Sequence, residues 1–146
     1  MNGNNSIMNG NNSIMNDNNS IVMLTFLTIV NQVKLYHWQT LSHPRHKATD
    51  ELYSDLSDNV DKFIEVLTGR CVIDQGNNKY RILMPNKHIK LQNYTDDNGL
   101  QLIKNIKLYL ESPELNNVIG NSTELGNIRD EMLASINKAS YLFTLN

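Results

Sequence analysis

Five side chains that could bind a metal ion lie between residues 37 and 65. In this part of the sequence two histidines and three carboxylates follow the pattern His-Trp-x7-His-x3-Asp-x10-Asp-x3-Glu. Imidazole and carboxylate ligands suit Fe(II), Mn(II) or Zn(II). The pattern therefore indicates a transition-metal site with these candidate ligands: His37, His46, Asp50, Asp61 and Glu65.

Four of the five fall on one strip of a single predicted helix. His46 and Asp50 are about one turn apart, as are Asp61 and Glu65, and the 11 residues from Asp50 to Asp61 make about three turns. Both pairs therefore face the same way, with Ser57 between them. Clustered acids repel one another unless a cation or a basic partner neutralises them, which favours a bound cation.

Two simpler interpretations remain open from the spacing alone. Charged residues on a helix can be a solvated face, where a His–Asp pair one turn apart contributes a few tenths of a kcal/mol. His37 lies among apolar residues, so it can be a core histidine that is bonded to a backbone carbonyl. Neither interpretation needs a metal ion.

Apolar residues recur at helical spacing in four segments, which predicts helices over residues 20–40, 44–68, 99–110 and 122–145. Residues 70–97 contain Asn-Asn, Pro and Asp-Asp punctuation, which predicts a long irregular crossover. The fold class that we expect is all-α, a four-helix bundle with this crossover between its second and third helices.

Three of the predicted helices carry apolar faces that should form the core. We expect the second helix to end at Gly69, and Ser112-Pro113 to end the third. The apolar face of the first helix contains Met23, Phe26, Val30, Val33 and Leu41. His37 lies in the middle of this face, and we expect Leu27 and Trp38 to lie on a covered strip beside it. The face of the second contains Ala48, Leu52, Leu56, Val60, Phe63 and Leu67. The face of the last contains Leu125, Ile128, Met132, Ile136, Ala139 and Phe143.

The N-terminal residues 1–20 follow a seven-residue repeat, MNGNNSI or MNDNNSI. A period of seven is typical of a coiled coil, but Asn and Gly are poor helix formers and each unit offers only Met and Ile as apolar residues. We therefore expect residues 1–20 to be an Asn-rich disordered tail and residues 21–146 to be the helical bundle.

Composition excludes several classes of protein. A net charge of -2 over 146 residues argues against a strongly basic nucleic-acid-binding protein. The apolar run at residues 21–30 is shorter than the about 20 residues of a membrane span, and no Lys or Arg precedes it as in a signal peptide. Cys71 is the single cysteine, which favours a reducing compartment. We expect a protein that is not secreted and does not bind a membrane.

The segment from His37 to Gly69 resembles the ferroxidase signature of the Dps mini-ferritins, which belong to the ferritin-like superfamily. That signature is His-Trp followed by His-x3-Asp-x10-Asp-x3-Glu, and Tyr36-His37-Trp38 resembles its first part. The second part is matched without a gap by His46, Asp50, Asp61 and Glu65. The spacing of the two histidines differs, because fewer residues separate His37 from His46 than in that family.

Ferritin-like proteins of phages and large DNA viruses resemble this chain still more closely. They often read His-Trp-Gln-Thr near the first histidine, and Ile-Arg-Asp-Glu then Tyr-Leu-Phe-Thr-Leu near the C-terminus. This chain has the same residues at 37–40, 128–131 and 141–145. The resemblance implies a viral or phage protein, cytoplasmic or virion-associated, from a group of unassigned function.

The resemblance implies a ferritin-like bundle that binds iron at a di-iron-type site and oxidises Fe(II) with oxygen or peroxide; Mn or Zn are the other metals. It also implies a homo-oligomer, because in Dps proteins the histidine side and the carboxylate side of the site come from two subunits. If this chain assembles differently, His43 and Glu131 are additional candidate ligands. The alternative is a structural or virion-associated helical protein that keeps the bundle without metal chemistry.

Direct binding to DNA is the weaker expectation. Residues 1–33 contain no Lys or Arg, so the tail lacks the electrostatic attraction to phosphates that drives such binding. Lys87, His88 and Lys90 form a small basic group in the predicted crossover, which we interpret as a solvated loop.

Overall fold

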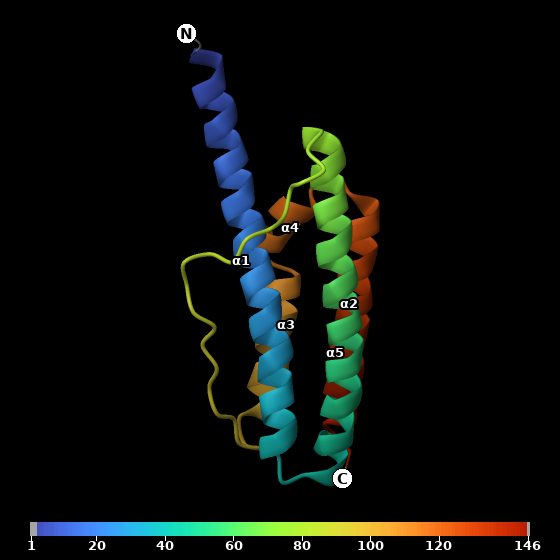
Figure 1. The fold of residues 1–146 in the computed structure, drawn as a ribbon. Helices are drawn as coiled ribbons and strands as arrows, with labels where there is room; N and C mark the ends of the chain where they lie inside the picture. The colour runs from blue at the N-terminus through green and yellow to red at the C-terminus, as the bar shows by residue number, and fades with distance from the viewer. Residues whose placement is uncertain (1–2, 146) are drawn as a thin grey trace.

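The computed structural model describes residues 3–145, with side chains from residue 18 onward. Within that part the chain forms helices and no strand, so the all-α prediction is confirmed (Figure 1). The five helices are α1 (Gly3–Gln39), α2 (His43–Gln75), α3 (Gly99–Leu110), α4 (Pro113–Ile119) and α5 (Thr123–Leu142).

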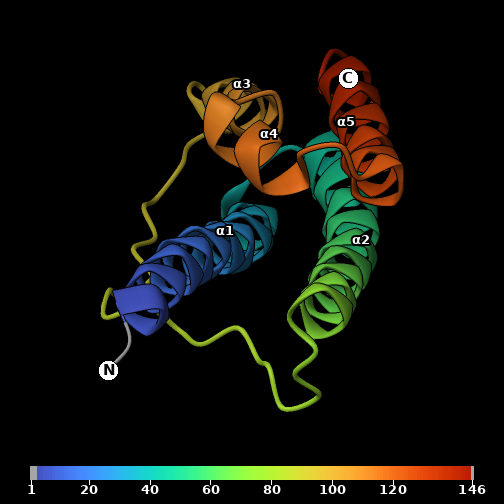
Figure 2. The ribbon, with the colours of Figure 1, turned by 90° about the horizontal axis from the view of Figure 1, so that it is seen from above.

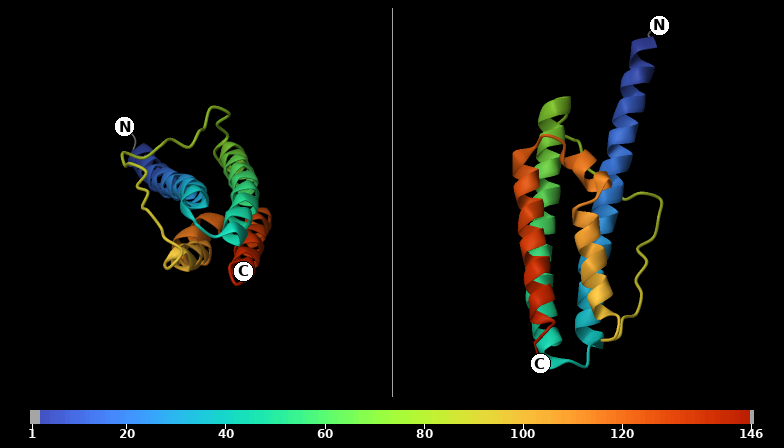
Figure 3. Two further views of the ribbon diagram at one scale, coloured as in Figure 1. Left: turned by 90° about the horizontal axis from the view of Figure 1, so that it is seen from below. Right: turned by 180° about the vertical axis from the view of Figure 1, so that it is seen from behind.

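The four longer helices contribute buried residues to one hydrophobic core, and Figure 2 shows their arrangement end-on. α1 packs against α2, α2 against α5, and α5 against α3, while the short α4 touches α1, α3 and α5. α1 and α2 run in opposite directions; the crossover then carries the chain back along the bundle, so that α3 runs with α2 and α5 runs against both (Figures 1 and 3). The predicted long crossover is confirmed at residues 77–98, which are irregular.

The core contains most of the apolar residues that the helical spacing predicts, although Met23 of the first helix is only partly buried and its neighbour Val22 is fully buried instead. All six predicted residues of α2 and all six of the last helix are buried. Phe26 of α1 meets Phe63 of α2 edge-to-face, with ring centroids 5.1 Å apart. This arrangement is favourable for aromatic pairs and joins the two helices at mid-length.

Two predictions about the end of α1 are wrong. Leu41 is 96% exposed, because α1 ends at Gln39 and Leu41 lies in the turn to α2 rather than on a helical face. Trp38 is 69% exposed instead of covered. Helical spacing no longer applies at Leu41, which lies beyond the helix, whereas Trp38 lies in the last turn of α1 with its side chain in solvent.

α2 does not end at Gly69 but continues for six residues, to Gln75. Cys71 is fully buried in this extension, and the Arg70 guanidinium donates to the carbonyls of Val118 and Ile119 at the end of α4. These contacts outweigh the roughly 1 kcal/mol by which a helical glycine is unfavourable. The helix stops at Gly76, which has a left-handed φ of 61°.

The sequence did not predict α4. Pro113 ends α3 as expected, but it also starts a new helix, because proline is tolerated in the first turn and Ser112 caps it by accepting a hydrogen bond from the Leu115 amide at 3.3 Å. Leu115 is fully buried.

The first helix begins earlier than composition predicts. α1 starts at Gly3, so helical backbone runs through the repeat that we expected to be disordered, and it extends past the ends of α2 and α5 (Figure 1). Extending an existing helix adds one hydrogen bond per residue without a new nucleus, which explains how Asn-rich units follow the apolar segment into a helix. The first residues with described packing are Asn18 and Asn19, and Asn19 donates to the Tyr80 hydroxyl at 3.1 Å.

No helix in the described part of the chain combines the length and the apolar character that crossing a bilayer requires.

The start of α3 packs closely against α1 at Gly99. A Cβ on Gly99 would lie 2.2 Å from the Tyr36 hydroxyl oxygen, and the aromatic ring itself blocks the position. Gly69 is the opposite case, because a Cβ there would meet nothing within 4 Å. Only the first glycine is required by packing.

We expect Gly99→Ala to lower the free energy of unfolding by about 1–3 kcal/mol, because the added methyl displaces Tyr36. Gly69→Ala is the matched control and should raise it by about 0.5–1 kcal/mol through the better helix propensity of alanine. Urea denaturation followed by circular dichroism measures both. A Gly99→Ala protein as stable as the wild type would contradict the packing described here.

Candidate functional site

The two candidate histidines meet at the corner between α1 and α2. The rings of His37 and His46 stack with centroids 3.9 Å apart and planes 19° apart. Nδ1 of His37 lies 2.8 Å from the carbonyl oxygen of His46, and Nδ1 of His46 lies 3.0 Å from the carbonyl oxygen of His37. Each ring therefore bonds to the backbone of the other residue.

This reciprocal pairing assigns the tautomer of both rings. A carbonyl oxygen can only accept, so in each neutral ring the proton sits on Nδ1 and the lone pair on Nε2. Metal-binding histidines commonly have this arrangement, in which a backbone carbonyl holds one nitrogen and orients the other. The expectation that His37 lies in the core is confirmed, since it is 7% exposed. His46 is exposed.

Thr49 supports the pair from the first turns of α2. It is fully buried, and its hydroxyl lies 2.7 Å from the carbonyl of Arg45 and 3.1 Å from Nδ1 of His37. The sequence pattern did not single out this threonine, because its hydroxyl is not one of the imidazole, thiolate or carboxylate groups by which a metal site is recognised in a sequence.

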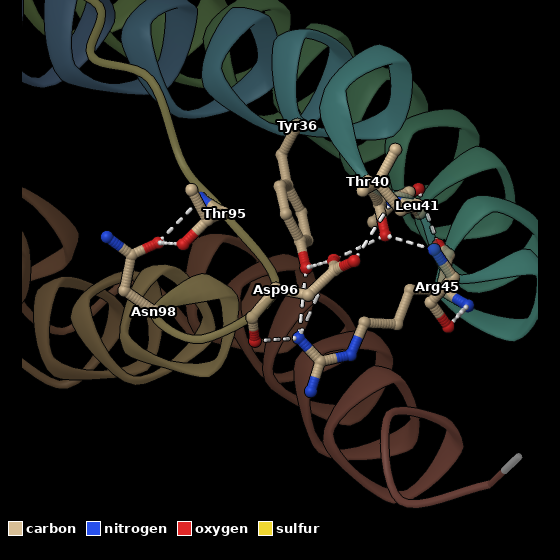
Figure 4. A network of polar contacts seen from close by, with 9 residues as sticks. Tyr36, Thr40, Leu41, Arg45, Thr95, Asp96 and Asn98 are labelled. Atoms are coloured by element: carbon tan, nitrogen blue, oxygen red, sulfur yellow. Dashed lines mark hydrogen bonds and ion pairs between the residues drawn. The ribbon is translucent and has the colours of Figure 1, made fainter.

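A polar network holds the corner in place, and Figure 4 shows it. Asp96 lies near the end of the crossover. Its Oδ1 accepts hydrogen bonds from the Tyr36 hydroxyl at 2.6 Å and from the Thr40 hydroxyl at 2.5 Å. Its Oδ2 accepts a hydrogen bond from the Leu41 amide at 2.9 Å. Arg45 donates to the Tyr36 hydroxyl at 3.0 Å and to the Asp96 carbonyl at 2.7 Å. Three segments therefore meet on one carboxylate.

The network changes the acidity of its members. Partial burial by itself would raise the pKa of Asp96, but the hydrogen bonds from Thr40, Tyr36 and Leu41, with the charge of Arg45, outweigh it and lower that pKa. Burial, and the hydrogen bond to Asp96, raise the pKa of Tyr36. Asp96 is therefore an anion and Tyr36 a neutral donor around neutral pH.

The three carboxylates of the pattern lie on the outward side of α2. Asp50, Asp61 and Glu65 are all exposed. Asp50 and Asp61 are 11 residues apart, which is about 16 Å along a helix that rises about 1.5 Å per residue. Oxygen and nitrogen ligands bind a metal ion at about 2.0–2.6 Å, so these two side chains cannot share one ion within a single chain.

Among the described residues, no cluster of three or more His, Cys, Asp and Glu side chains is close enough to hold a metal ion. The structure brings His37 and His46 together and keeps them apart from Asp61 and Glu65. The role of these residues as ligands stays a prediction.

The two additional candidates lie elsewhere. Glu131 lines a hollow of about 310 Å³ between α2 and α5, together with Asn59 and Lys62. It therefore faces a different side of α2 from Asp50, Asp61 and Glu65, which we call the acidic strip. His43 is the exposed first residue of α2.

The exposed Trp38 and the partly buried Tyr53 lie on either side of Lys34, between α1 and α2. The Lys34 ammonium lies 4.6 Å from the centroid of the Tyr53 ring and 5.7 Å from that of Trp38. Exposed aromatic side chains are typical of surfaces that contact another protein.

Comparison with known proteins gives one match. A family model described as a family of unknown function (DUF5856) covers residues 37–143, from the first candidate histidine to the end of the last helix. The chain has no match among curated proteins. It has none among solved structures.

The low pKa of Asp96 predicts how stability depends on pH. A carboxyl with a lower pKa in the folded state stabilises the protein above the pKa of about 3.9 that it has when unfolded, and this contribution is lost as the pH falls through the folded value. We expect Asp96→Asn to lower the free energy of unfolding by about 1–3 kcal/mol at neutral pH. The difference from the wild type should shrink below about pH 4.

Denaturation at a series of pH values measures this, with the exposed neighbour Asp97→Asn as the matched control. If the two variants were equally stable at neutral pH, Asp96 would not hold the corner.

Proposed function

We propose that this chain, which belongs to a family of unknown function (DUF5856), is a ferritin-like, Dps-like protein that oxidises Fe(II) at a site shared by two copies of the chain. The order of the helices supports the ferritin-like part of this proposal. The chain forms an antiparallel pair of helices, then one long crossover, then a second antiparallel pair. Ferritin-like bundles have this connectivity. The resemblance of residues 37–69 to the ferroxidase signature supports the iron chemistry.

The observation that carries the proposal is a symmetry in the spacing along α2. Six polar residues on one face of α2 form a regular series: His46, Asp50, Ser54, Ser57, Asp61 and Glu65. They are separated by intervals of 4, 4, 3, 4 and 4 residues, and this order of intervals is the same in both directions along the helix. The centre of this series lies midway between residues 55 and 56. A two-fold axis at that point would pair each half of the series with the other half.

Two antiparallel α2 helices related by such an axis would form a complete ligand set twice. His46 would face Glu65 of the partner subunit, and Asp50 would face Asp61 of the partner subunit. Ser54 and Ser57 lie at the crossing point, where small side chains allow the helices to approach to about 8–10 Å. An interface of this kind uses the same surface on both copies, as two-fold dimers do.

The chemistry of the shared site follows from its ligands. His37 and His46 offer Nε2 lone pairs, which suit Fe(II), and the carboxylates of Asp50, Asp61 and Glu65 stabilise the Fe(III) that forms. Each ferrous ion gives up one electron, and a pair of ferrous ions reduces one hydrogen peroxide to water. Trp38 and Tyr53 lie beside the strip, where indole and phenol rings could intercept oxidising by-products.

A structural role without metal chemistry is the second candidate. The carbonyl bonds of His37 and His46 would be sufficient to pack the corner, and the acidic strip would then be a polar seam between subunits. Iron oxidation distinguishes the two functions.

We expect Asp61→Asn with Glu65→Gln to slow Fe(III) formation at least about ten-fold when oxygen or peroxide is admitted to the full chain loaded with Fe(II). Asp74→Asn with Glu111→Gln is the matched control, since both carboxylates are exposed and neither lies on the strip. Equal rates in all three proteins would leave the structural role.

Mixed subunits test the shared site directly. One variant carries His46→Ala with Asp50→Asn, and the other carries Asp61→Asn with Glu65→Gln. Each should be inactive alone, but unfolding and refolding the two together should restore about a quarter of the wild-type rate, since half of the dimers are hybrids and each hybrid has one intact site. No recovery in dimers of confirmed hybrid composition would rule out a shared site.

A further inference from the structure

A groove runs between α1, α3 and the crossover, on the side of the molecule away from the acidic strip. One part is a hollow of about 340 Å³ with apolar walls that include Ile29, Leu102 and Ile106. A second hollow of about 510 Å³ is lined by Leu24 and the basic group of the crossover. Thr25, Thr28 and Lys90 line both hollows, so the two form one continuous groove.

The crossover that forms one wall is fixed in place. The side-chain amide of Gln32 donates to the Gln92 carbonyl at 2.7 Å and accepts from the Gln92 amide at 2.9 Å. The amide of Tyr94 donates to Gln39 at 3.2 Å, and Tyr94 is buried. Because backbone groups of the crossover pair with α1 in this way, the groove is preformed rather than a gap under a loose loop.

Tyr109 lines the apolar hollow, and its hydroxyl is a buried donor that has no hydrogen-bond partner among the described residues. The Thr25 hydroxyl lies close enough to oppose, in small part, the rise in the pKa of Tyr109, but it is not in hydrogen-bonding geometry with the Tyr109 hydroxyl and donates its own proton to the Ile21 carbonyl at 2.8 Å. Burial, reinforced by the charge of Glu114, raises the pKa of Tyr109, so the phenol keeps its proton. A buried donor without a partner is unfavourable, and an acceptor on a ligand would satisfy it.

Positive charge gathers at the other end of the groove. Lys87, His88 and Lys90 are exposed, and within the described part of the chain none of them forms an ion pair. Their exposure agrees with the solvated loop that the sequence predicts, and the structure adds that they line the mouth of a hollow against α1. An apolar hollow with a few convergent polar groups is the usual form of a small-molecule site.

We propose that this groove binds a small organic anion with an apolar body, of the class of medium-chain carboxylates. The carboxylate accepts from the Tyr109 hydroxyl and pairs with the Lys90 ammonium where the two hollows join. The alkyl tail of the ligand lies between Ile29, Leu102 and Ile106, and Lys87 adds positive potential at the mouth. The inference is independent of iron, because no candidate metal ligand lines either hollow.

Decanoate is the probe, titrated into the full chain and followed by calorimetry and by NMR. We expect saturable binding of one decanoate per chain, with shifts at groove residues. Decyltrimethylammonium has the same tail with the opposite charge, and acetate has the head without the tail; both should bind at least ten-fold more weakly. Equal affinity for decanoate and the ammonium compound, or no saturable binding of decanoate, would overturn the proposal.

Two conservative variants test the assigned contacts. Tyr109→Phe removes one oxygen and Lys90→Gln removes one charge at an exposed position, and each should weaken decanoate binding about ten-fold. Lys104→Gln, on the exposed side of α3, is the matched control and should leave the affinity unchanged. Affinities for decanoate that are the same in all three variants and the wild type would contradict the assignment.

Discussion

The carboxylate of Asp96 is the interaction on which the rest of the structure depends. It lies at the end of a 22-residue crossover and accepts hydrogen bonds from α1 and from the turn that leads to α2. Arg45 closes the network and also stacks over the Phe143 ring at 4.9 Å, which ties the last helix to the same point. One charged group therefore fixes where the crossover ends, where α3 begins and how sharply α1 turns into α2.

The shape of the turn decides what the histidines can do. His37 is in the last turn of α1 and His46 is in the first turns of α2, so only a tight corner brings their rings into contact. The short spacing between them, compared with the Dps pattern, is consistent with this geometry. Because Nδ1 of each ring is bonded to a carbonyl, the lone pair of each neutral ring lies on Nε2, and these two atoms are the histidine half of the site that we propose. The proposed partner copy supplies the carboxylate half.

Much of the fold follows from local sequence. The apolar period placed the core faces of α2 and α5 correctly because buried positions on long helices recur every three or four residues. The period failed at Leu41 and Trp38, where the helix ends, and at Gly69, where Arg70 and Cys71 make tertiary contacts that outweigh a local stop signal. Tertiary contacts of this kind cannot be read from the sequence of one segment.

The candidate site was predicted in part. The spacing identified His37 and His46, which do meet, but it could not show that Asp96, 50 residues further along the chain, would position them. The segment Asp96-Asp97-Asn98-Gly99 is typical of a turn and carries no sign of a long-range partner. The close contact between Gly99 and Tyr36 likewise appears only when α1 and α3 are placed together.

The most direct measurement is long-range ¹H–¹⁵N NMR of the full chain labelled on histidine, before and after addition of Zn(II) as a diamagnetic probe. We expect a proton on Nδ1 and a lone pair on Nε2 for the neutral rings of His37 and His46, and Zn(II)-dependent shifts at those two Nε2 atoms. His43 and His88 serve as internal controls and should not respond. A lone pair on Nδ1 of either corner histidine, or a Zn(II) response at His43 or His88 alone, would contradict it.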